Sequence, residues 1–252
     1  MRLLRDYSRQ ARTYDRTRGA GTSFLAALRG ALAGSPGRTL ADIGGGTGNY
    51  ARALAADGWQ PLVVDRSPAM LARAAAKGLA TLEADAEQLP LADRSFDAAM
   101  LVSMLHHTEH PERAISEAAR ILRPGGRLAI VAFTRENAED MWLPEYFPSS
   151  RPWMAATHPP AATLAAPLHG AAVSSFAVSD TDDASLAALC GRPDLLLDAD
   201  WRSQTSFFER LERDDAAGLA AGLERLASDV AAGKAPRRPG RATLIAWSAP
   251  GA

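Results

Sequence analysis

The segment TLADIGGGTG, residues 39–48, runs from an apolar stretch directly into four glycines within five positions. Glycine loses much conformational entropy when it is ordered, so this density needs a structural reason. Thr39–Ile43 is predicted to be a buried strand, and 49–56 a helix. A strand, a glycine turn and a helix are typical of a site for a nucleotide-like ligand, because the turn and the helix start bring backbone N–H groups to it.

The alternation of strands and helices continues beyond this turn. We predict further strands at 61–64, 80–83, 98–102 and 127–133, helices at 23–32, 68–77 and 111–122, and a turn at 123–126. This order indicates an α/β fold in which helices cover both faces of a parallel sheet. The rhythm stops after Thr134, where 135–170 hold six prolines, and 182–233 are predicted to be helical.

The spacing of the glycines separates two kinds of ligand. In the dinucleotide fingerprint G-x-G-x-x-G/A, counting from Gly44 puts Asn49 at the last position, where a small residue is required. Counting from Gly46 ends on Ala51, which fits but lies well inside the helix. The other pattern has an acid two residues before the first glycine and glycine at every second position. It is matched throughout, by Asp42, Gly44, Gly46 and Gly48.

Three further motifs follow in order: VVDRSPAML (63–71), EADAEQLPLADRSFDAAMLVSMLHH (83–107) and ILRPGGRLAIVAF (121–133). With these motifs the chain resembles the class I S-adenosylmethionine-dependent methyltransferases, in particular the small-molecule group of the ubiquinone/menaquinone-biosynthesis methyltransferases. The resemblance runs from Thr39 to about Phe133. It implies a Rossmann-like, doubly wound, mostly parallel seven-stranded sheet with helices on both faces and a helical cap.

The resemblance also implies how the chain is divided. We expect an N-terminal helical lid over 1–36 and an S-adenosylmethionine-binding core over 37–134. Cap insertions with a strand near 173–178 are expected over 135–241, and a final strand and tail over 242–252. The implied activity is in-line transfer of the methyl group to oxygen, nitrogen or carbon of a small molecule, with S-adenosylhomocysteine as product. No motif in 135–241 indicates which acceptor is used.

The family's binding residues carry over to matching positions of this chain. The amino acid end of the cofactor would lie over the glycine turn, with Asp42 accepting a hydrogen bond from the ammonium. Asp65, 23 residues after Asp42, would accept from both ribose hydroxyls, and Asp85 from the adenine amino group. Asp42 could instead brace the loop, Asp85 could be an ordinary loop acid, and Asp65 could cap the helix at Pro68, although Ser67 fills that role better. The cofactor-binding residues expected in full are Asp42, Gly44, Gly46, Gly48, Asp65, Arg66, Met70, Asp85, Ala86, Ser103, Tyr14 and Arg18, with Leu89 opposite Met70 on the adenine.

Three histidines, His106, His107 and His110, follow the fourth strand in LHHTEHPE, at the edge where ligands of α/β sheets bind. His107 or His106 is the candidate general base, because a phenol or enol acceptor must lose a proton. The same histidines could brace the loop or line the pocket. No carboxylate or second histidine cluster is spaced to complete a metal site, so we expect no metal.

Composition narrows the partners. The net charge of −1 and pI of about 6.5 give no general attraction to nucleic acid or anionic membranes. There is no apolar run of membrane-spanning length and no signal-peptide pattern at the start, and Cys190 is the single cysteine. We therefore expect a cytoplasmic protein that acts on a small, hydrophobic or aromatic acceptor, and no oligomeric state is predicted.

Two alternatives stay open at this point. One is a protein that binds S-adenosylmethionine without transferring its methyl group, because the cofactor motifs would be the same. The other is a nicotinamide-dependent oxidoreductase, which Asn49 and the spacing from Asp42 disfavour. Trp142, Trp153 and Trp201 could line an acceptor pocket or attach the cap to the core.

Overall fold

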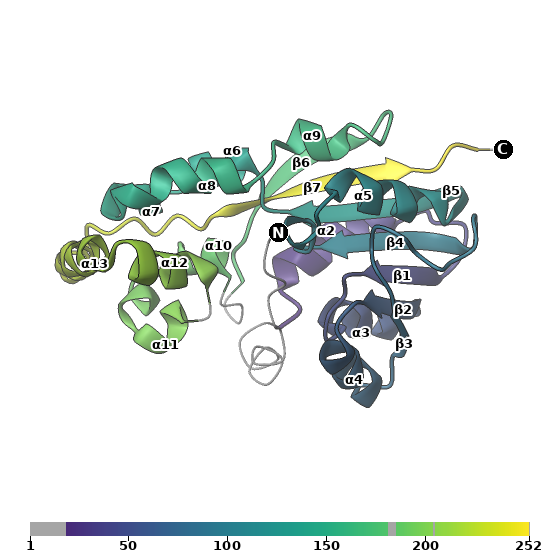
Figure 1. The fold of residues 1–252 in the computed structure, drawn as a ribbon, viewed down its shortest axis with the longest axis horizontal. Helices are drawn as coiled ribbons and strands as arrows, with labels where there is room; N and C mark the ends of the chain where they lie inside the picture. Colours follow the sequence, from purple (N-terminus) through teal and green to yellow (C-terminus); the bar gives the residue numbers. More distant parts are fainter. Residues whose placement is uncertain (1–18, 181–184, 204, 252) are drawn as a thin grey trace.

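A computed structural model describes residues 19–180, 185–203 and 205–251, and within these ranges not the side chain of Ala155. The described strands form one sheet in the order β3-β2-β1-β4-β5-β7-β6 (Figure 1). Strands β1 to β5 are parallel, and β7 is antiparallel to both of its neighbours. The strands are β1 (Thr39–Ile43), β2 (Gln60–Asp65), β3 (Ala80–Glu83), β4 (Phe96–Val102), β5 (Leu122–Ala132), β6 (Ala172–Ala177) and β7 (Arg241–Ser248).

Helices cover the sheet on both faces, as the alternating sequence predicts. Neighbouring strand residues point to opposite faces, so Leu40 and Ala41 enter two separate hydrophobic cores. The first core is covered by α2 (Thr22–Leu32), α3 (Asn49–Ala56) and α4 (Pro68–Ala76). The second is covered by α5 (Pro111–Arg120) and α9 (Ala161–Ala165).

The boundaries of α4 follow from local chemistry. The Ser67 hydroxyl accepts a hydrogen bond from the N–H of Met70 at 3.4 Å, and Pro68 occupies the first helical position. Gly78, with a φ of 80°, then lets the chain leave the helix in a left-handed conformation. The sequence prediction of this helix is confirmed.

The predicted turn at 123–126 is wrong. These residues lie within β5 as an irregularity, because Phe96 pairs with Leu122 and Ala98 already pairs with Arg127. Gly125, with a φ of 76°, absorbs the extra length. Glycines mark a turn and a bulge equally well, and the neighbouring strand decides which one forms. The helix predicted to reach Leu122 ends at Arg120 for the same reason, since β5 begins at Leu122.

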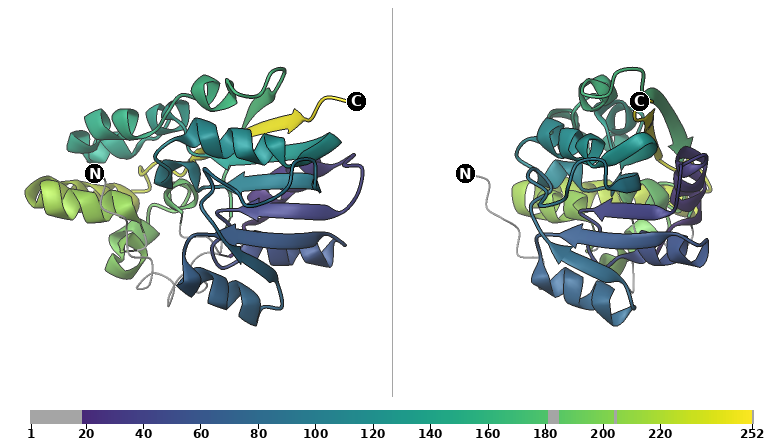
Figure 2. Two further views of the ribbon diagram at one scale, coloured as in Figure 1. Left: turned by 45° about the vertical axis from the view of Figure 1, so that its right-hand side comes forward. Right: turned by 90° about the vertical axis from the view of Figure 1, so that its right-hand side faces the viewer.

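A second lobe, which we call the cap lobe, lies at the end of the sheet toward which the parallel strands point (Figures 1 and 2). It comprises 135–157 and the described part of 185–231. In its described part, the segment 182–233, which is predicted to be helical, is a series of separate helices. The helices of the lobe are α6 (Arg135–Glu139), α7 (Leu143–Tyr146), α8 (Arg151–Thr157), α10 (Leu186–Leu189), α11 (Ala199–Arg202), α12 (Ser206–Asp214) and α13 (Ala216–Ala231), with 3₁₀ turns at Pro148–Ser150 and Leu195–Leu197.

The cap lobe and the sheet share one continuous core. Phe147 packs against the rings of Phe207 and Phe208, and all three belong to the same hydrophobic cluster as Leu28 under the sheet. The lobe is therefore held against the sheet by buried apolar surface rather than by a flexible linker alone. Among the residues that the structure describes, no helix is long and apolar enough to cross a membrane.

Candidate functional site

The four glycines after β1 have different surroundings. Gly44, Gly46 and Gly48 all have left-handed φ angles, of 68°, 56° and 72°. A Cβ on Gly44 would lie 2.8 Å from the Cβ of Met104, and one on Gly48 would lie 2.5 Å from Leu79. A Cβ on Gly46 would meet nothing within 4 Å. Gly44 and Gly48 are thus required for packing as well as for φ, and Gly46 faces open space.

Asp42 is a buried carboxylate immediately below this turn. It sits in β1 with 2% of its surface exposed, and a Cβ on Gly45 would collide with its carboxylate. None of the hydrogen bonds among the described residues ends on its oxygens. Burial, and then the nearby charge of Asp65, raise the pKa of Asp42 to about 7. A buried carboxylate is unfavourable in its charged form unless a partner compensates it, and a cationic hydrogen-bond donor is such a partner.

Asp65, at the end of β2, holds the glycine turn in place. One carboxylate oxygen accepts from the N–H of Gly46 at 2.9 Å, and the other accepts from the N–H of Ser67 at 2.8 Å. Asp65 therefore braces its loop. Each oxygen keeps a further lone pair, so two hydroxyl groups can still be bound. Arg66, the next residue, is exposed.

The expected adenine side lies after β3. The Asp85 side chain is exposed, and one oxygen accepts from the N–H of Glu87 at 2.9 Å. Ala86 follows it and is half-buried. Met70 and Leu89 are each 5% exposed, so their side chains are largely covered.

The chain after β4 has a strained backbone. Ser103 is exposed and has a φ of 52°, which is rare for a residue other than glycine, and its N–H donates to Val131 at 2.8 Å. The following 3₁₀ helix, Leu105–His107, places the rings of His106 and His107 3.7 Å apart between centroids. Backbone strain of this kind is concentrated at ligand sites. Met104, the residue after Ser103, lies directly beside Gly44, so this loop adjoins the glycine turn. Tyr14 and Arg18, the expected lid residues, lie outside the described residues.

His158 is a residue that the sequence did not single out for a role. The loop after α8 brings its ring edge-on to Phe133, directly after β5, with centroids 4.8 Å apart. Its Nδ1 is buried and has no hydrogen-bond partner among the described residues. Burial lowers the pKa of His158 to about 4, so the ring is neutral at pH 7. No local pattern in the proline-rich segment could have placed it at the end of β5.

Two tryptophans of the cap lobe serve packing. The indole N–H of Trp142 donates to the carbonyls of Cys190 and Arg238, at 3.1 and 3.2 Å. Trp153 packs against the ring of Phe207, 5.3 Å away. Of the two uses that the sequence left open for these side chains, attachment of the cap is the one these contacts serve.

A separate groove of about 410 Å³ lies at the opposite end of the sheet. Its lining includes Arg38 and Trp59, which directly precede β1 and β2. Ligands of open α/β sheets bind at the carboxyl ends of the strands, so we assign no part of the site to this groove. In the described part of the chain, no group of three or more His, Cys, Asp or Glu residues is arranged to hold a metal ion.

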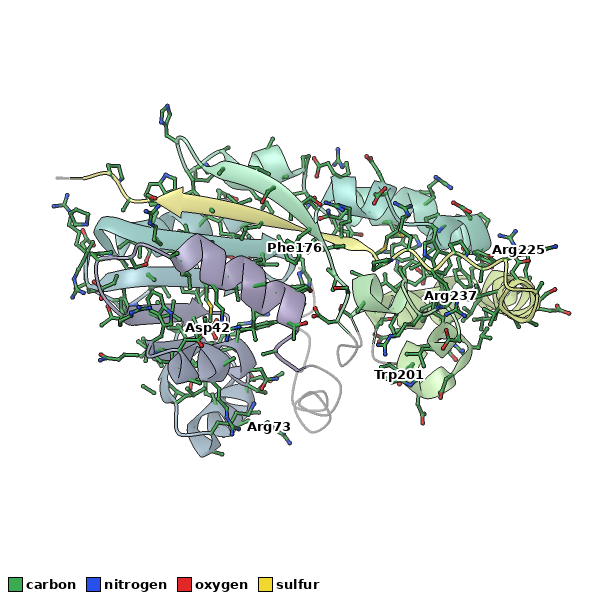
Figure 3. The ribbon with its side chains drawn as sticks, turned by 180° about the vertical axis from the view of Figure 1, so that it is seen from behind. Asp42, Arg73, Phe176, Trp201, Arg225 and Arg237 are labelled. Carbon is green, nitrogen blue, oxygen red and sulfur yellow. The ribbon has the colours of Figure 1, made fainter. Side chains whose placement is uncertain are left out.

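The fold and this edge together define a class of protein. A doubly wound sheet with a glycine turn, a buried acid in β1 and an acid at the end of β2 is built to hold a nucleoside-containing ligand with a cationic group. Figure 3 shows Asp42 under α2, inside the sheet lobe. The ends of β1, β2, β4 and β5 all face the cap lobe.

Comparison with known proteins gives the family. Residues 41–130 match the family described as a methyltransferase domain. The ubiquinone/menaquinone biosynthesis C-methyltransferase UbiE of Brucella anthropi is 41% identical over 124 residues, which cover 42% of this chain and 47% of that protein. An uncharacterized methyltransferase of Mycobacterium tuberculosis is 44% identical over 102 residues, covering 40% of this chain and 42% of its own. The chain thus spans less than half the length of these curated relatives.

A solved structure extends the likeness over the whole fold. A putative methyltransferase from an antibiotic biosynthesis pathway of Anabaena variabilis superposes with a TM-score of 0.73 and 26% identity, covering 91% of this chain and 98% of its own. The domain match and these likenesses support a class I S-adenosylmethionine-dependent methyltransferase. The predictions of the family, of its methyl donor and of the Rossmann-like sheet are confirmed.

Proposed function

We propose that this protein binds S-adenosylmethionine at the edge formed by Asp42, Gly46 and Asp65 and transfers its methyl group to a small molecule. The observation that carries the proposal is the Asp42 carboxylate, which is 2% exposed and accepts no hydrogen bond from any described residue. A buried acid without a donor is unfavourable unless a ligand supplies one. The ammonium of the cofactor's amino acid end is such a donor.

The other residues of the edge fit the same ligand. Gly46 offers open space beside its backbone, where the amino acid end can approach closely. Asp65 has lone pairs left for the two ribose hydroxyls, and Asp85 lies exposed beyond it for the adenine amino group. When bound, S-adenosylmethionine supplies a methyl group activated by a positively charged sulfur. The chain itself contributes alignment and the exclusion of water.

The acceptor would bind between this edge and the cap lobe. Ser103, His107 and His158 lie after β4 and β5 at the same edge, where they can contact an acceptor. An imidazole can accept a proton or hold a hydroxyl, so His107 is the candidate base, and His158, whose burial disfavours protonation, is a candidate to hold a hydroxyl. We favour a small molecule over a nucleic acid because the net charge is −1. The cytoplasmic location of the protein stays a prediction.

Two measurements test the proposal. Calorimetric titration with S-adenosylhomocysteine should show binding that NAD does not share. Radiolabelled methyl groups from S-adenosylmethionine should then appear in at least one member of a panel of phenols, enols, amines and carboxylates. Binding of NAD without binding of S-adenosylhomocysteine would contradict the site. Cofactor binding without transfer to any acceptor in a broad panel would favour the non-transferring alternative.

A further inference from the structure

Arg192 lies in the cap lobe between α10 and the 3₁₀ turn Leu195–Leu197. The backbone fixes its position, because its N–H donates to Leu189 at 2.9 Å and its carbonyl accepts from Leu195 at 3.0 Å. Its guanidinium lies over the indole of Trp201, with Cζ 5.3 Å from the ring centroid. The side chain is therefore held in one place before any ligand arrives.

Two donor atoms of the Arg192 guanidinium have no hydrogen-bond acceptor among the described residues. Its Nε and Nη2 atoms are buried and have no hydrogen-bond partner among the residues that the structure describes. The N–H bonds of these two atoms point the same way along one edge of the guanidinium, in its plane. Trp201 covers a face of that plane, so the stacking leaves the edge unsatisfied. Leaving two buried N–H donors of a half-buried guanidinium without acceptors is costly, and an anion would satisfy both.

Two described acids that follow Arg192 in the sequence, Asp194 and Asp198, have other partners. Asp194 pairs with Arg237 at 3.1 Å. One oxygen of Asp198 accepts from the N–H of Asp200 at 2.8 Å, as the cap of α11. Among the described residues, Nε and Nη2 thus form a two-pronged donor to which no carboxylate is hydrogen-bonded, which is the arrangement of a binding site rather than of a structural ion pair.

The fold places Arg192 at the same edge of the sheet as the cofactor residues. Ala187, in α10, accepts a hydrogen bond from the N–H of Gly240 at 2.7 Å, directly before β7. The start of β7 lies beside the end of β5, since Thr243 pairs with Ala132. Figure 3 shows Trp201 on the side of the cap lobe nearest the sheet lobe. An acceptor bound at this edge of the sheet would therefore lie on the side of the cap lobe that carries Trp201.

We propose that Arg192 recognises an oxyanion of the methyl acceptor, a carboxylate or a phosphate. Nε and Nη2 donate two parallel hydrogen bonds to two oxygens of that group, and Trp201 keeps the guanidinium in the required orientation. The acceptor is then an anionic small molecule, with the anion held in the cap lobe and the reacting atom directed to the cofactor edge. The identity of the ligand as the acceptor rests on the proposed function, whereas the anion site does not.

The test uses small anionic probes on the full chain. Benzoate, phenyl phosphate and neutral benzamide are titrated by calorimetry or NMR, with and without S-adenosylhomocysteine. Arg192→Met removes the donors, and Arg192→Lys keeps the charge but cannot make two parallel bonds. Arg210→Met is the matched control, because Arg210 also lies over a tryptophan, Trp153 at 4.5 Å, but pairs with Asp214 at 3.2 Å.

Both anions, or one of them, should bind the wild-type protein, and benzamide should not. Arg192→Met should weaken anion binding by about tenfold or more and Arg192→Lys by about fivefold, with Arg210→Met within about twofold of wild type. The stronger anion identifies carboxylate or phosphate. Equal anion binding by wild type and both Arg192 variants would overturn the proposal, and the lysine variant decides if the methionine variant does not fold.

The cofactor titration separates the two proposals. Arg192→Met should keep the wild-type affinity for S-adenosylhomocysteine, and weaker binding would show that the anion is the cofactor's own carboxylate, which would overturn the acceptor assignment. Anion binding at Arg192 in a protein that does not bind S-adenosylhomocysteine would contradict the proposed function and leave the anion site standing.

Discussion

Replacing Asp42 by asparagine should stabilise the ligand-free protein at pH 8 and weaken its hold on the cofactor. The pKa of Asp42 rises from 3.8 to about 7 on folding, mainly because the carboxylate is buried. At about 1.4 kcal/mol for each tenfold change in an equilibrium, this difference makes the charged form about 4 kcal/mol unfavourable in the folded state. Asparagine keeps the shape beside Gly45, but its unpartnered amide costs about 1–3 kcal/mol. The free energy of unfolding at pH 8 should therefore rise by about 2 kcal/mol.

The pH dependence of this effect has a definite sign. Between pH 3.8 and about 7 the folded protein keeps a proton on Asp42 that the unfolded chain has lost, so wild-type stability falls as the pH rises through this window. Asparagine does not titrate. The advantage of the Asp42→Asn variant should therefore be full above pH 7, vanish near pH 5 and become a loss of about 2 kcal/mol near pH 4, where only the cost of the unpartnered amide remains.

Ligand binding should change in the opposite direction. The ammonium of the ligand donates a charge-assisted hydrogen bond to the ionised carboxylate. Loss of the carboxylate charge should therefore lower the affinity for S-adenosylhomocysteine by about tenfold to a hundredfold. The change in stability is measured by urea denaturation at pH 4.5 and at pH 8, and the change in affinity by calorimetric titration. Asp57→Asn is the control, because Asp57 pairs with Arg29 at the far end of the sheet and its loss should leave the affinity unchanged. A variant that is less stable at pH 8 and binds S-adenosylhomocysteine like wild type would refute this reasoning.

Three further substitutions test the rest of the site. Asp65→Ala should weaken the binding of S-adenosylhomocysteine by about 1–3 kcal/mol in calorimetry, because contacts to the ribose hydroxyls and the hydrogen bond from the N–H of Gly46 are lost. An unchanged affinity would remove Asp65 from the site. Gly46→Ala should cost about 1 kcal/mol of stability because of its left-handed φ and should reduce cofactor affinity. Gly48→Ala should cost about 2–3 kcal/mol of stability, because the new Cβ would collide with Leu79. If denaturation curves show Gly46→Ala to be the less stable variant, the open space at Gly46 and the close contact at Gly48 are contradicted. The free energy of unfolding of the wild type should fall by about 3 kcal/mol between pH 6.5 and 4, because the unfolded chain binds a proton at His158 that the buried ring does not. His158→Gln should remove this fall, and a variant with the pH profile of the wild type would exclude the burial of His158.

Local rules were enough for the elements next to the glycine turn. β1 and α3 have the predicted boundaries, Thr39–Ile43 and Asn49–Ala56, because a buried apolar run and a left-handed glycine at the helix start are visible in the sequence. The bulge at 123–126 could not be told from a turn, because only its pairing with β4 distinguishes the two. The breaks between α10 and α13 likewise depend on packing against the sheet and the rest of the lobe.

By itself, the sequence determined the α/β fold, the glycine turn and the family, because these depend on residues close together along the chain. Tertiary structure alone decided which glycine faces open space, since that depends on Met104 and Leu79 across the turn. It also decided that Asp42 and one edge of Arg192 find no hydrogen-bond partner among the described residues, and that His158 lies at the end of β5. Burial and hydrogen bonding are properties of surroundings assembled from distant segments, and no pattern of neighbouring residues contains them.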